Sequence, residues 1–413
     1  MSTGALAGYA DWPAYLAGAS AFVPIGSDGR RDTGGGGERG TASPADDAAP
    51  GIDASPGNNA AAGPEADPSR ALVEVLGVRA ATAADVKVER EWVADGVRGR
   101  ELSWWLGFGP RTRAYLLEPA EHDGRLPGVL ALHAHGGVRS TGAEQLVDTG
   151  RAPSPSAARM RARCYAGRTP ANDLARDGFV VLVPDAFSWA SRAFDLSSPP
   201  EVLARLGAAL DALHRERRET LSADERFDEL SSLHEYGIAK AAGALGTTFA
   251  GAVATDDLAA LDVLADWPGV DAGRLGAMGF SGGGGRALFA GALDGRVAAS
   301  VVAGMMATSA SLVPDYLDTH SWLLHSPGLA ARFDLPDIAA LGRRVLVQYG
   351  ERDELFPRQG MTDADTRLRT LLGARYTGAW HDAGHEFTAA MQDEAREFLR
   401  QALLRRARGD TAA

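Results

Sequence analysis

One short glycine-rich segment carries a serine in a setting that suits nucleophilic catalysis. Ser281 stands in Gly279-Phe280-Ser281-Gly282-Gly283, the pattern G-x-S-x-G. The apolar residues 274–280 before it predict a strand, and residues 286–293 after it predict a helix. A sharp strand-to-helix turn exposes the hydroxyl at a helix N-terminus, where developing negative charge is stabilised. Side chains at positions 279 and 283 would collide in that turn, so glycine is needed there.

Two other interpretations compete for this segment. It resembles in composition a glycine-rich turn with an incidental serine, or a loop that binds phosphate. The run Gly282 to Gly285 lacks the G-K-[ST] ending of a phosphate-binding loop. The strand before the serine and the helix after it favour the nucleophile.

A nucleophilic serine needs a base and an acid further along the chain, in loops that follow strands. His385, in Gly384-His385-Glu386-Phe387, follows the last predicted strand and is the candidate base; His381 is the alternative. Asp353 comes just after the predicted strand 344–349 and is the candidate acid. Other carboxylates remain open as the acid: Asp315, Asp318, Asp382, Glu351 and Glu354.

The segment 133–137, His-Ala-His-Gly-Gly, follows the first buried strand of the predicted sheet. Loops at this place donate a backbone amide to an oxyanion, and the residue after the nucleophile donates another. We therefore expect oxyanion contacts from Gly282, Gly136 and Gly137. A metal site at the two histidines is the alternative, but no acidic or cysteine partner nearby completes one, so no metal and no cofactor are expected.

The elements around these residues alternate between strands and helices. Strands are expected at 129–133, 179–184, 274–280, 297–302, 344–349 and 375–380, after hairpin strands within 86–117 that turn at Asp95-Gly96. Helices are expected at 171–177, 255–266 and 393–405. This order predicts a doubly wound, mostly parallel sheet. Residues 187–245 interrupt the order and are helical in composition, so we interpret them as an insertion and possible lid.

The first part of the chain differs in composition from the rest. Residues 1–23 hold Tyr9, Trp12, Tyr15 and Phe22 and are expected to pack on the main body. Residues 24–70 are rich in Gly, Ala, Pro, Ser and Asp and contain no aromatic residue, which predicts a disordered linker. The catalytic domain is expected at 71–408.

Bulk properties narrow the class of protein. The chain has 413 residues, 45% of them hydrophobic, and a formal net charge of −12. The acidic balance argues against a nucleic-acid partner or an anionic membrane surface. Cys164 is the single cysteine, so no intramolecular disulfide can form. The start of the chain lacks the pattern of a secretory signal, and no stretch of about 18 apolar residues predicts a membrane span. A cytoplasmic location is expected; the oligomeric state is left open.

Together, four segments resemble the dienelactone hydrolase and acetyl xylan esterase-like branch of the α/β hydrolases. They are residues 131–137, 181–187, 279–284 and 384–387. The resemblance spans roughly residues 85–405, most of the expected ordered chain. It implies the α/β-hydrolase fold and ester hydrolysis. Dienelactone hydrolases proper use a cysteine nucleophile, whereas this chain has Ser281 at that place and Cys164 far away in sequence.

We therefore predict a serine hydrolase that cleaves small carboxylic esters through an acyl-enzyme, with Ser281, Asp353 and His385 as its triad. A peptidase or acyl-peptide hydrolase of the same fold is the first alternative. The second is a non-catalytic binding protein on a hydrolase scaffold, although a binder needs no complete set of Ser, Asp and His.

Overall fold

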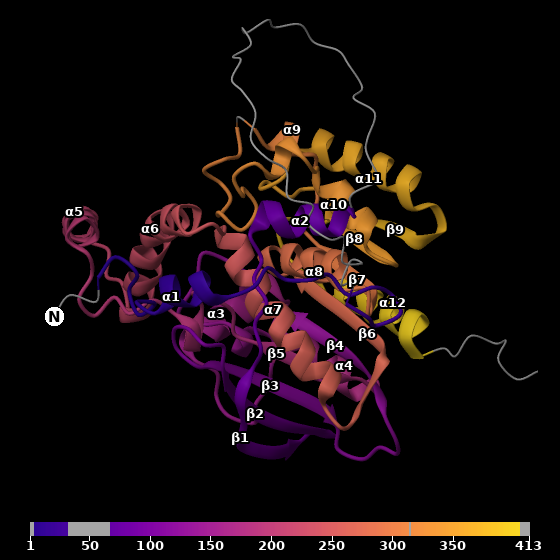
Figure 1. Cartoon of the computed structure of the whole chain (residues 1–413). Coiled ribbons are helices and arrows are strands. Elements are labelled where there is room, and N and C mark those ends of the chain that lie inside the picture. The colour runs from indigo at the N-terminus through magenta and orange to yellow at the C-terminus, as the bar shows by residue number, and fades with distance from the viewer. Residues whose placement is uncertain (1–3, 32–66, 314, 405–413) are drawn as a thin grey trace, which may run out of the picture.

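The computed structural model describes residues 4–31, 67–313 and 315–404, and this part of the chain contains a nine-stranded sheet (Figure 1). The strands are β1 Ala84–Ala94, β2 Val97–Trp105, β3 Thr112–Pro119, β4 Leu126–Leu132, β5 Val180–Pro184, β6 Val270–Phe280, β7 Val297–Ala303, β8 Val345–Gly350 and β9 Tyr376–His381. Their spatial order is β1-β2-β3-β5-β4-β6-β7-β8-β9. The pairs β1–β2, β2–β3 and β3–β5 are antiparallel, and the pairs from β5 through β4 to β9 are parallel. The predicted mostly parallel sheet is confirmed.

Local sequence explains the two halves of the sheet. Asp95 and Gly96 have φ angles of 49° and 73°, the left-handed pair that a tight hairpin turn requires, and they join β1 to β2 as predicted. The strand β5, Val-Val-Leu-Val-Pro, is buried along its whole length. A strand buried on both faces lies inside a sheet covered by helices, and β5 lies at such a place, paired antiparallel with β3 and parallel with β4.

Helices cover both faces of the sheet. They are α1 Trp12–Gly18, α2 Pro68–Leu76, α3 Pro155–Cys164, α4 Pro170–Arg176, α5 Glu201–Arg217, α6 Ala223–Ala244, α7 Phe249–Asp266, α8 Gly282–Leu293, α9 Ser309–Leu312, α10 Leu335–Leu341, α11 Arg358–Leu372 and α12 Ala389–Leu399, which continues as a π-helical turn at Arg400–Leu404. Leu130 and Leu132 of β4 pack in one core with α2, α7, α8, α10 and α11. Val129 and Ala131 point the other way, into a second core with α3, α4 and α12.

The N-terminal segment packs on the main body, as the sequence predicts. Tyr9 and Trp12 are buried beside Phe187, with ring centroids 4.6 and 5.0 Å from it. The predicted disordered linker 24–70 is wrong at both of its ends. Ile25 is buried, and α2 already begins at Pro68 because Asp67 caps its first turn. Residues 32–66, the bulk of that prediction, lie outside the described residues.

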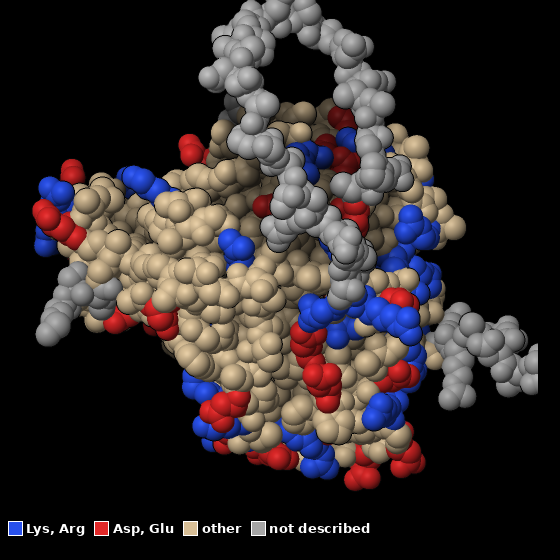
Figure 2. Space-filling model, viewed as in Figure 1, with Lys and Arg blue, Asp and Glu red and all other residues tan. Residues whose placement is uncertain are grey.

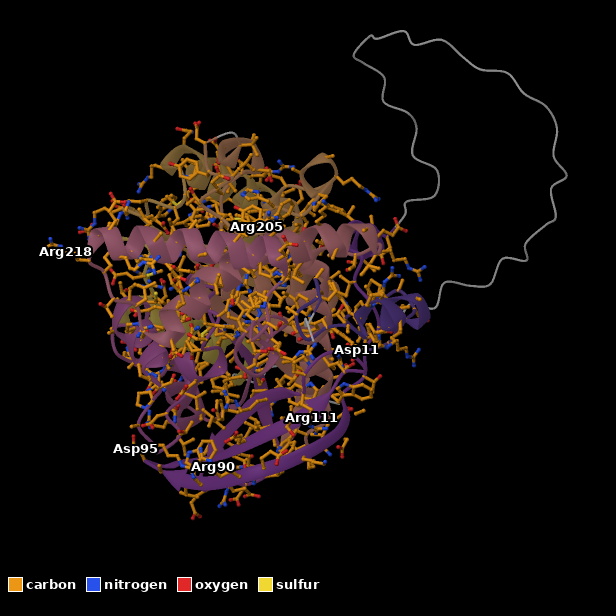
Figure 3. All side chains as sticks on the ribbon, turned by 90° about the vertical axis from the view of Figure 1, so that its left-hand side faces the viewer. Asp11, Arg90, Asp95, Arg111, Arg205 and Arg218 are labelled. Atoms are coloured by element: carbon orange, nitrogen blue, oxygen red, sulfur yellow. The ribbon has the colours of Figure 1, made fainter. Side chains whose placement is uncertain are left out.

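The predicted insertion 187–245 contains α5 and α6, which extend to the left of the body in Figure 1. Seen from that side, α5 runs across the upper half of the body between the labelled Arg205 and Arg218, and the β1–β2 hairpin with Arg90 and Asp95 lies at the bottom (Figure 3). Ser222 begins α6 with a reciprocal capping box to Glu225. That this insertion moves as a lid stays a prediction.

The surface mixes charges of both signs. On the face shown in Figure 2, Lys and Arg lie among Asp and Glu, mainly toward the edges of the molecule, and much of the middle is uncharged. None of the helices within the described ranges has the length and apolar character needed to cross a membrane.

Candidate active site

Ser281 lies at the junction between β6 and α8, on a strained backbone. Its φ and ψ angles are 55° and −127°, a conformation that L-residues rarely adopt. A Cβ on Gly279 would lie 2.1 Å from the Gly283 carbonyl oxygen, and a Cβ on Gly283 would lie 2.1 Å from that of Leu132. The prediction that both positions require glycine is therefore confirmed. The turn holds the serine at the N-terminus of α8.

The three predicted triad residues meet in space. The His385 Nε2 atom lies 2.8 Å from the Ser281 Oγ atom, and His385 Nδ1 lies 2.8 Å from Asp353 Oδ2. The Asp353 side chain is 1% exposed, and its Oδ1 accepts a hydrogen bond from the Leu355 amide at 2.9 Å. With Nδ1–H donating to the carboxylate, the imidazole presents an unprotonated Nε2 to the serine hydroxyl. This arrangement can remove a proton from Ser281.

The rival residues have other partners or are exposed, and the carboxylate bonded to His385 is that of Asp353. His381 Nε2 lies 2.9 Å from a carboxylate oxygen of Glu394, and Asp382 forms an exposed ion pair with Arg352. The remaining carboxylates are exposed: Asp315, Asp318, Glu351 and Glu354.

The loop after β4 approaches the elbow closely. A Cβ on Gly282 would lie 2.8 Å from the His135 Cβ and 3.0 Å from the His135 nitrogen. The Gly282 amide is one of the first in α8, and such amides have no partner within their helix. The Gly137 amide, in contrast, donates to His135 Nδ1 at 3.0 Å. Oxyanion contacts from Gly282 and Gly136 stay predictions, while the Gly137 amide is already engaged.

The rings of His133 and His135, weighed above as metal ligands, have other partners. His133 is buried, its Nδ1 lies 3.0 Å from the Ala134 carbonyl oxygen, and burial holds its pKa well below the usual range. His135 lies between Gly137 and Glu235. Both rings also contact Trp189 edge to face.

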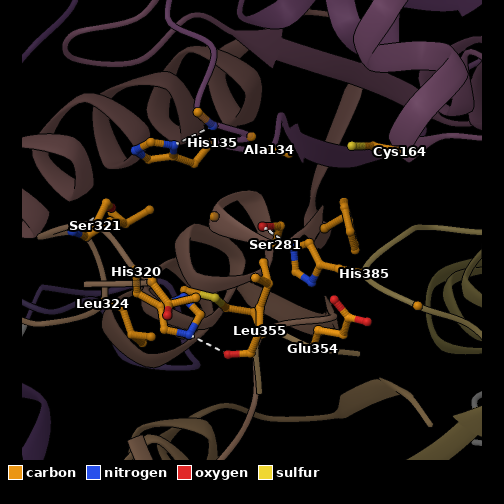
Figure 4. Close-up of a pocket in the computed structure, with 18 of the residues that line it drawn as sticks. Ala134, His135, Cys164, Ser281, His320, Ser321, Leu324, Glu354, Leu355 and His385 are labelled. Carbon is orange, nitrogen blue, oxygen red and sulfur yellow. Dashed lines mark hydrogen bonds between the residues drawn. The ribbon is translucent and has the colours of Figure 1, made fainter. Parts of the chain in front are cut away.

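A cavity of about 520 Å³ opens over Ser281 (Figure 4). One wall is formed by residues 134–137 with Arg163 and Cys164, and the opposite wall by residues 319–321, Leu323 and Leu324. Arg352, Glu354, Leu355, Gly384 and His385 border it, and Phe280, Gly282 and Met305 lie beside the serine. None of the described residues 187–245 lines this cavity. The second wall comes instead from the segment between β7 and β8.

Two cavity residues had no role in the sequence prediction. His320 Nε2 lies 2.8 Å from the Leu355 carbonyl oxygen, and burial lowers the pKa of this histidine to about 4 against the opposing effect of that bond. Cys164, distant from Ser281 in sequence, lines the same cavity. The loop after β7 has no recognisable motif, so no sequence signal points to His320.

Two sequence comparisons relate this chain to known proteins. The model of the dienelactone hydrolase family matches residues 167–405. The protein YtaP of Bacillus subtilis (strain 168), a hydrolase by name, is 24% identical over 299 residues, which are 70% of this chain and 82% of YtaP.

Solved structures share the fold. Acetyl xylan esterase 1 from Thermoanaerobacterium sp. JW/SL YS485 superposes with a TM-score of 0.50 and 17% identity, over 81% of this chain and 91% of that chain. A glucuronoyl esterase from Solibacter usitatus gives a TM-score of 0.50 and 15% identity, over 80% and 91%. These similarities show the α/β-hydrolase fold.

Proposed function

Since the chain belongs to the dienelactone hydrolase family and is therefore a hydrolase, we propose that it cleaves carboxylic esters with Ser281 as its nucleophile. One observation carries the proposal: His385 lies 2.8 Å from both the Ser281 hydroxyl and the Asp353 carboxylate. His385 can take the proton of Ser281 while Asp353 holds the imidazole, and the strained serine stands at a helix N-terminus.

The first half of the reaction forms an acyl-enzyme. The Ser281 oxygen bonds to the ester carbonyl carbon while His385 Nε2 takes the hydroxyl proton, and the carbonyl electron pair moves onto its oxygen. The Gly282 amide donates to that oxygen. When the intermediate collapses, the bond to the alcohol oxygen breaks, and the alcohol leaves with the proton from His385.

The second half releases the acid. His385 takes a proton from a water molecule, whose oxygen bonds to the acyl carbon; collapse then returns the proton to Ser281 and frees the carboxylic acid. Asp353 keeps the imidazole in the required tautomer and stabilises the imidazolium in both halves. The mechanism requires no cofactor.

The cavity has room for a short-chain ester beside Ser281. Met305, Leu323 and Leu324 give it an apolar side near Ser281, and its volume of about 520 Å³ suits a small ester. The names of the acetyl xylan esterase and the glucuronoyl esterase also denote ester cleavage. We therefore propose acetyl and similar short-chain esters as substrates.

Hydrolysis of p-nitrophenyl acetate by the wild type and by Ser281→Ala tests the proposal. We expect wild-type turnover and a loss of roughly 10⁴- to 10⁶-fold in the variant. A fluorophosphonate should label the Ser281 peptide of the wild type, as mapped by mass spectrometry, and leave the variant unlabelled. Equal activity in both folded proteins would show that another group is the nucleophile.

A further inference from the structure

A buried glutamate that belongs to no catalytic motif connects three segments around the cavity. Glu235, on α6, accepts hydrogen bonds from the Arg139 guanidinium and, at 2.8 Å, from the Trp322 amide, and its Oε2 lies 3.3 Å from His135 Nε2. His135 belongs to the first cavity wall, and Trp322 lies within the segment that forms the second. One carboxylate of the insertion thus contacts both walls.

The pair of Glu235 and Arg139 is enclosed by protein. The Arg139 side chain is fully buried and that of Glu235 is 5% exposed. The guanidinium carbon of Arg139 lies 4.2 Å from the centroid of the Trp189 ring. Burial alone would raise the pKa of Glu235, but the charge of Arg139 and the bond to His135 lower it to about 2. The carboxylate therefore stays ionised throughout the range in which esterases work.

A second carboxylate of α6 holds the same loop. Asp228 lies seven residues before Glu235, two helical turns away on the same face. It accepts hydrogen bonds from the Arg139 amide at 2.8 Å and from the Ser140 amide at 2.7 Å. Two buried carboxylates of α6 therefore hold this loop: Glu235 contacts His135, and Asp228 contacts the amides of residues 139 and 140.

The hydrogen bonds of His135 determine its tautomer. The Gly137 amide donates to Nδ1 at 3.0 Å, so this nitrogen is unprotonated and Nε2 carries the hydrogen (Figure 4). Arg139 Nη2 also lies 3.3 Å from Nε2, but a protonated Nε2 can only donate, and its acceptor is Glu235. The ring is thus held between the backbone of its own loop and α6.

Fixing this ring also fixes the peptide that carries it. The His135 carbonyl oxygen accepts from the Val138 amide at 3.1 Å, and Gly136 and Gly137 take φ angles of 60° and 69°. The His135 nitrogen lies at the close approach to Gly282 described above, and both residues line the cavity together with Ser281. The backbones of His135 and Gly282 therefore meet beside the nucleophile.

We propose that Glu235 is a positioning residue for acyl transfer: through the His135 ring it holds the His135 amide opposite the Gly282 amide, so that both donate to the oxyanion. The inference rests on the proposed ester hydrolysis and adds to it a donor, His135, and the side chain that places it. It assigns a catalytic purpose to α6, although no described residue of 187–245 lines the cavity.

Replacing the ester carbonyl oxygen by sulfur tests this role, because sulfur accepts hydrogen bonds weakly and gains little from an aligned oxyanion site. We would compare p-nitrophenyl acetate with its thionoester in the wild type, Glu235→Gln and His135→Asn. The Asn side chain can accept the Gly137 amide within an Asx-type turn but is too short to reach Glu235. This second variant also keeps the buried pair of Glu235 and Arg139 intact, so it decides the question if Glu235→Gln does not fold.

In both variants we expect kcat/KM for the oxoester to fall about 30-fold, mostly through kcat, and that for the thionoester to fall less than about threefold. The preference for the oxoester then shrinks by about a factor of ten. Glu229→Gln, on the same helix but paired with His214, is the matched control and should keep the wild-type preference. Near-UV circular dichroism confirms that each variant is folded.

Other outcomes overturn the inference. If a folded variant loses both activities by the same factor, Glu235 does not act through hydrogen bonds to the oxyanion. If neither activity changes, the contact has no catalytic consequence. If the wild type hydrolyses neither ester, the proposed function itself fails. If the wild type is active and the variants keep its preference for the oxoester, only the role of Glu235 fails.

Discussion

The two sides of Ser281 are built in different ways. On the base side, His385 and Asp353 each follow a parallel strand, β9 and β8, and meet through short loops. On the oxyanion side, the loop after β4 is held by side chains from distant helices. Its residue His135 contacts Glu235 of α6, 100 residues away, and the His133 carbonyl oxygen accepts from Arg286 of α8.

This difference shows which parts of an active site a strand order can determine. Parallel strands end at one edge of the sheet, so residues just after them converge without help from other elements. The loop after β4 is positioned by the sheet only where it leaves that strand. It needs buried ionic contacts to fix it, and these depend on an insertion that carries no motif.

The largest predicted effect tests the base side. Asp353→Asn should lower kcat for p-nitrophenyl acetate by about 10⁴-fold, because an amide in place of the carboxylate favours the wrong imidazole tautomer. Steady-state kinetics measure it. Asp382→Asn and His381→Gln replace the nearest rivals and should stay within about threefold of the wild type. Comparable losses in Asp382→Asn and Asp353→Asn would mean that the acid was assigned to the wrong loop.

The next effect tests the support behind the oxyanion loop. Arg286 and Asp257 form a buried bidentate pair at 2.6 and 2.9 Å, with side chains 2% and 3% exposed. Arg286→Met leaves Asp257 buried without its partner and should cost about 3–5 kcal/mol of unfolding free energy. Denaturant titration measures this loss.

The double variant Arg286→Met/Asp257→Leu separates charge from packing. It removes both buried charges and should recover most of the stability, while the His133 carbonyl still lacks its donor. If the double variant is as unstable as the single one, the pair contributes through packing and not through the unpaired charge.

The residues that lie just after strands are also the ones that could be predicted from the sequence. Ser281, Asp353 and His385 could be predicted because each follows a strand whose apolar run is visible. Glycine at 279 is required by a contact within the elbow itself, whereas glycine at 283 is required by the Leu132 carbonyl of β4. The sheet followed from the same runs. The Gly137 amide was predicted to donate to the oxyanion. A loop motif does not reveal that the ring of His135, in the same loop, already accepts a hydrogen bond from this amide.

The remaining misses have a common physical cause. Glu235 resembles any other acid of a charged helix until the fold buries it against Arg139, and His320 reaches the cavity from a segment without regular patterning. Composition likewise suggested that residues near 25 and 70 belong to a linker, yet Ile25 is buried and Asp67 caps α2. Tertiary contacts decide these positions, and sequence spacing does not encode them.

A smaller effect is expected from pH, through the helix that holds the loop after β4. His234 of α6 is buried against Phe194, with ring centroids 4.9 Å apart, and burial, aided by the charge of Arg139, lowers its pKa to about 4. In the unfolded chain His234 takes up a proton near pH 6.5, whereas in the folded protein it stays neutral until about pH 4. Protonation therefore favours the unfolded chain, and the free energy of unfolding should fall as the pH drops from about 6.5 to 4. We expect His234→Phe to reduce that loss by about 3 kcal/mol at most.

His214 of α5 provides a control of opposite sign. Hydrogen bonding to Glu219 and the nearby Glu229 raise the pKa of this histidine. Its contribution is present below the unfolded pKa and is lost as the pH rises through the folded value. His214→Gln should therefore weaken the protein more at pH 5 than at pH 8, as thermal unfolding at both pH values would show.

For His234, the contradicting outcome is a pH profile of stability that is identical in the wild type and in His234→Phe. Other groups would then cause the acid sensitivity.

The smallest expected effect concerns the thiol in the cavity. Cys164 is 5% exposed and packs in the second core, and its carbonyl oxygen accepts from the Phe387 amide at 2.7 Å, two residues after His385. Because that bond uses the backbone, Cys164→Ala preserves it and removes only one sulfur atom from the wall. We expect kcat/KM for p-nitrophenyl acetate to stay within about threefold of the wild type, with unchanged fluorophosphonate labelling. A loss of two orders of magnitude would instead favour the thiol as nucleophile, the residue type that dienelactone hydrolases proper use. The base and the loop after β4 would then have to serve Cys164 and not Ser281.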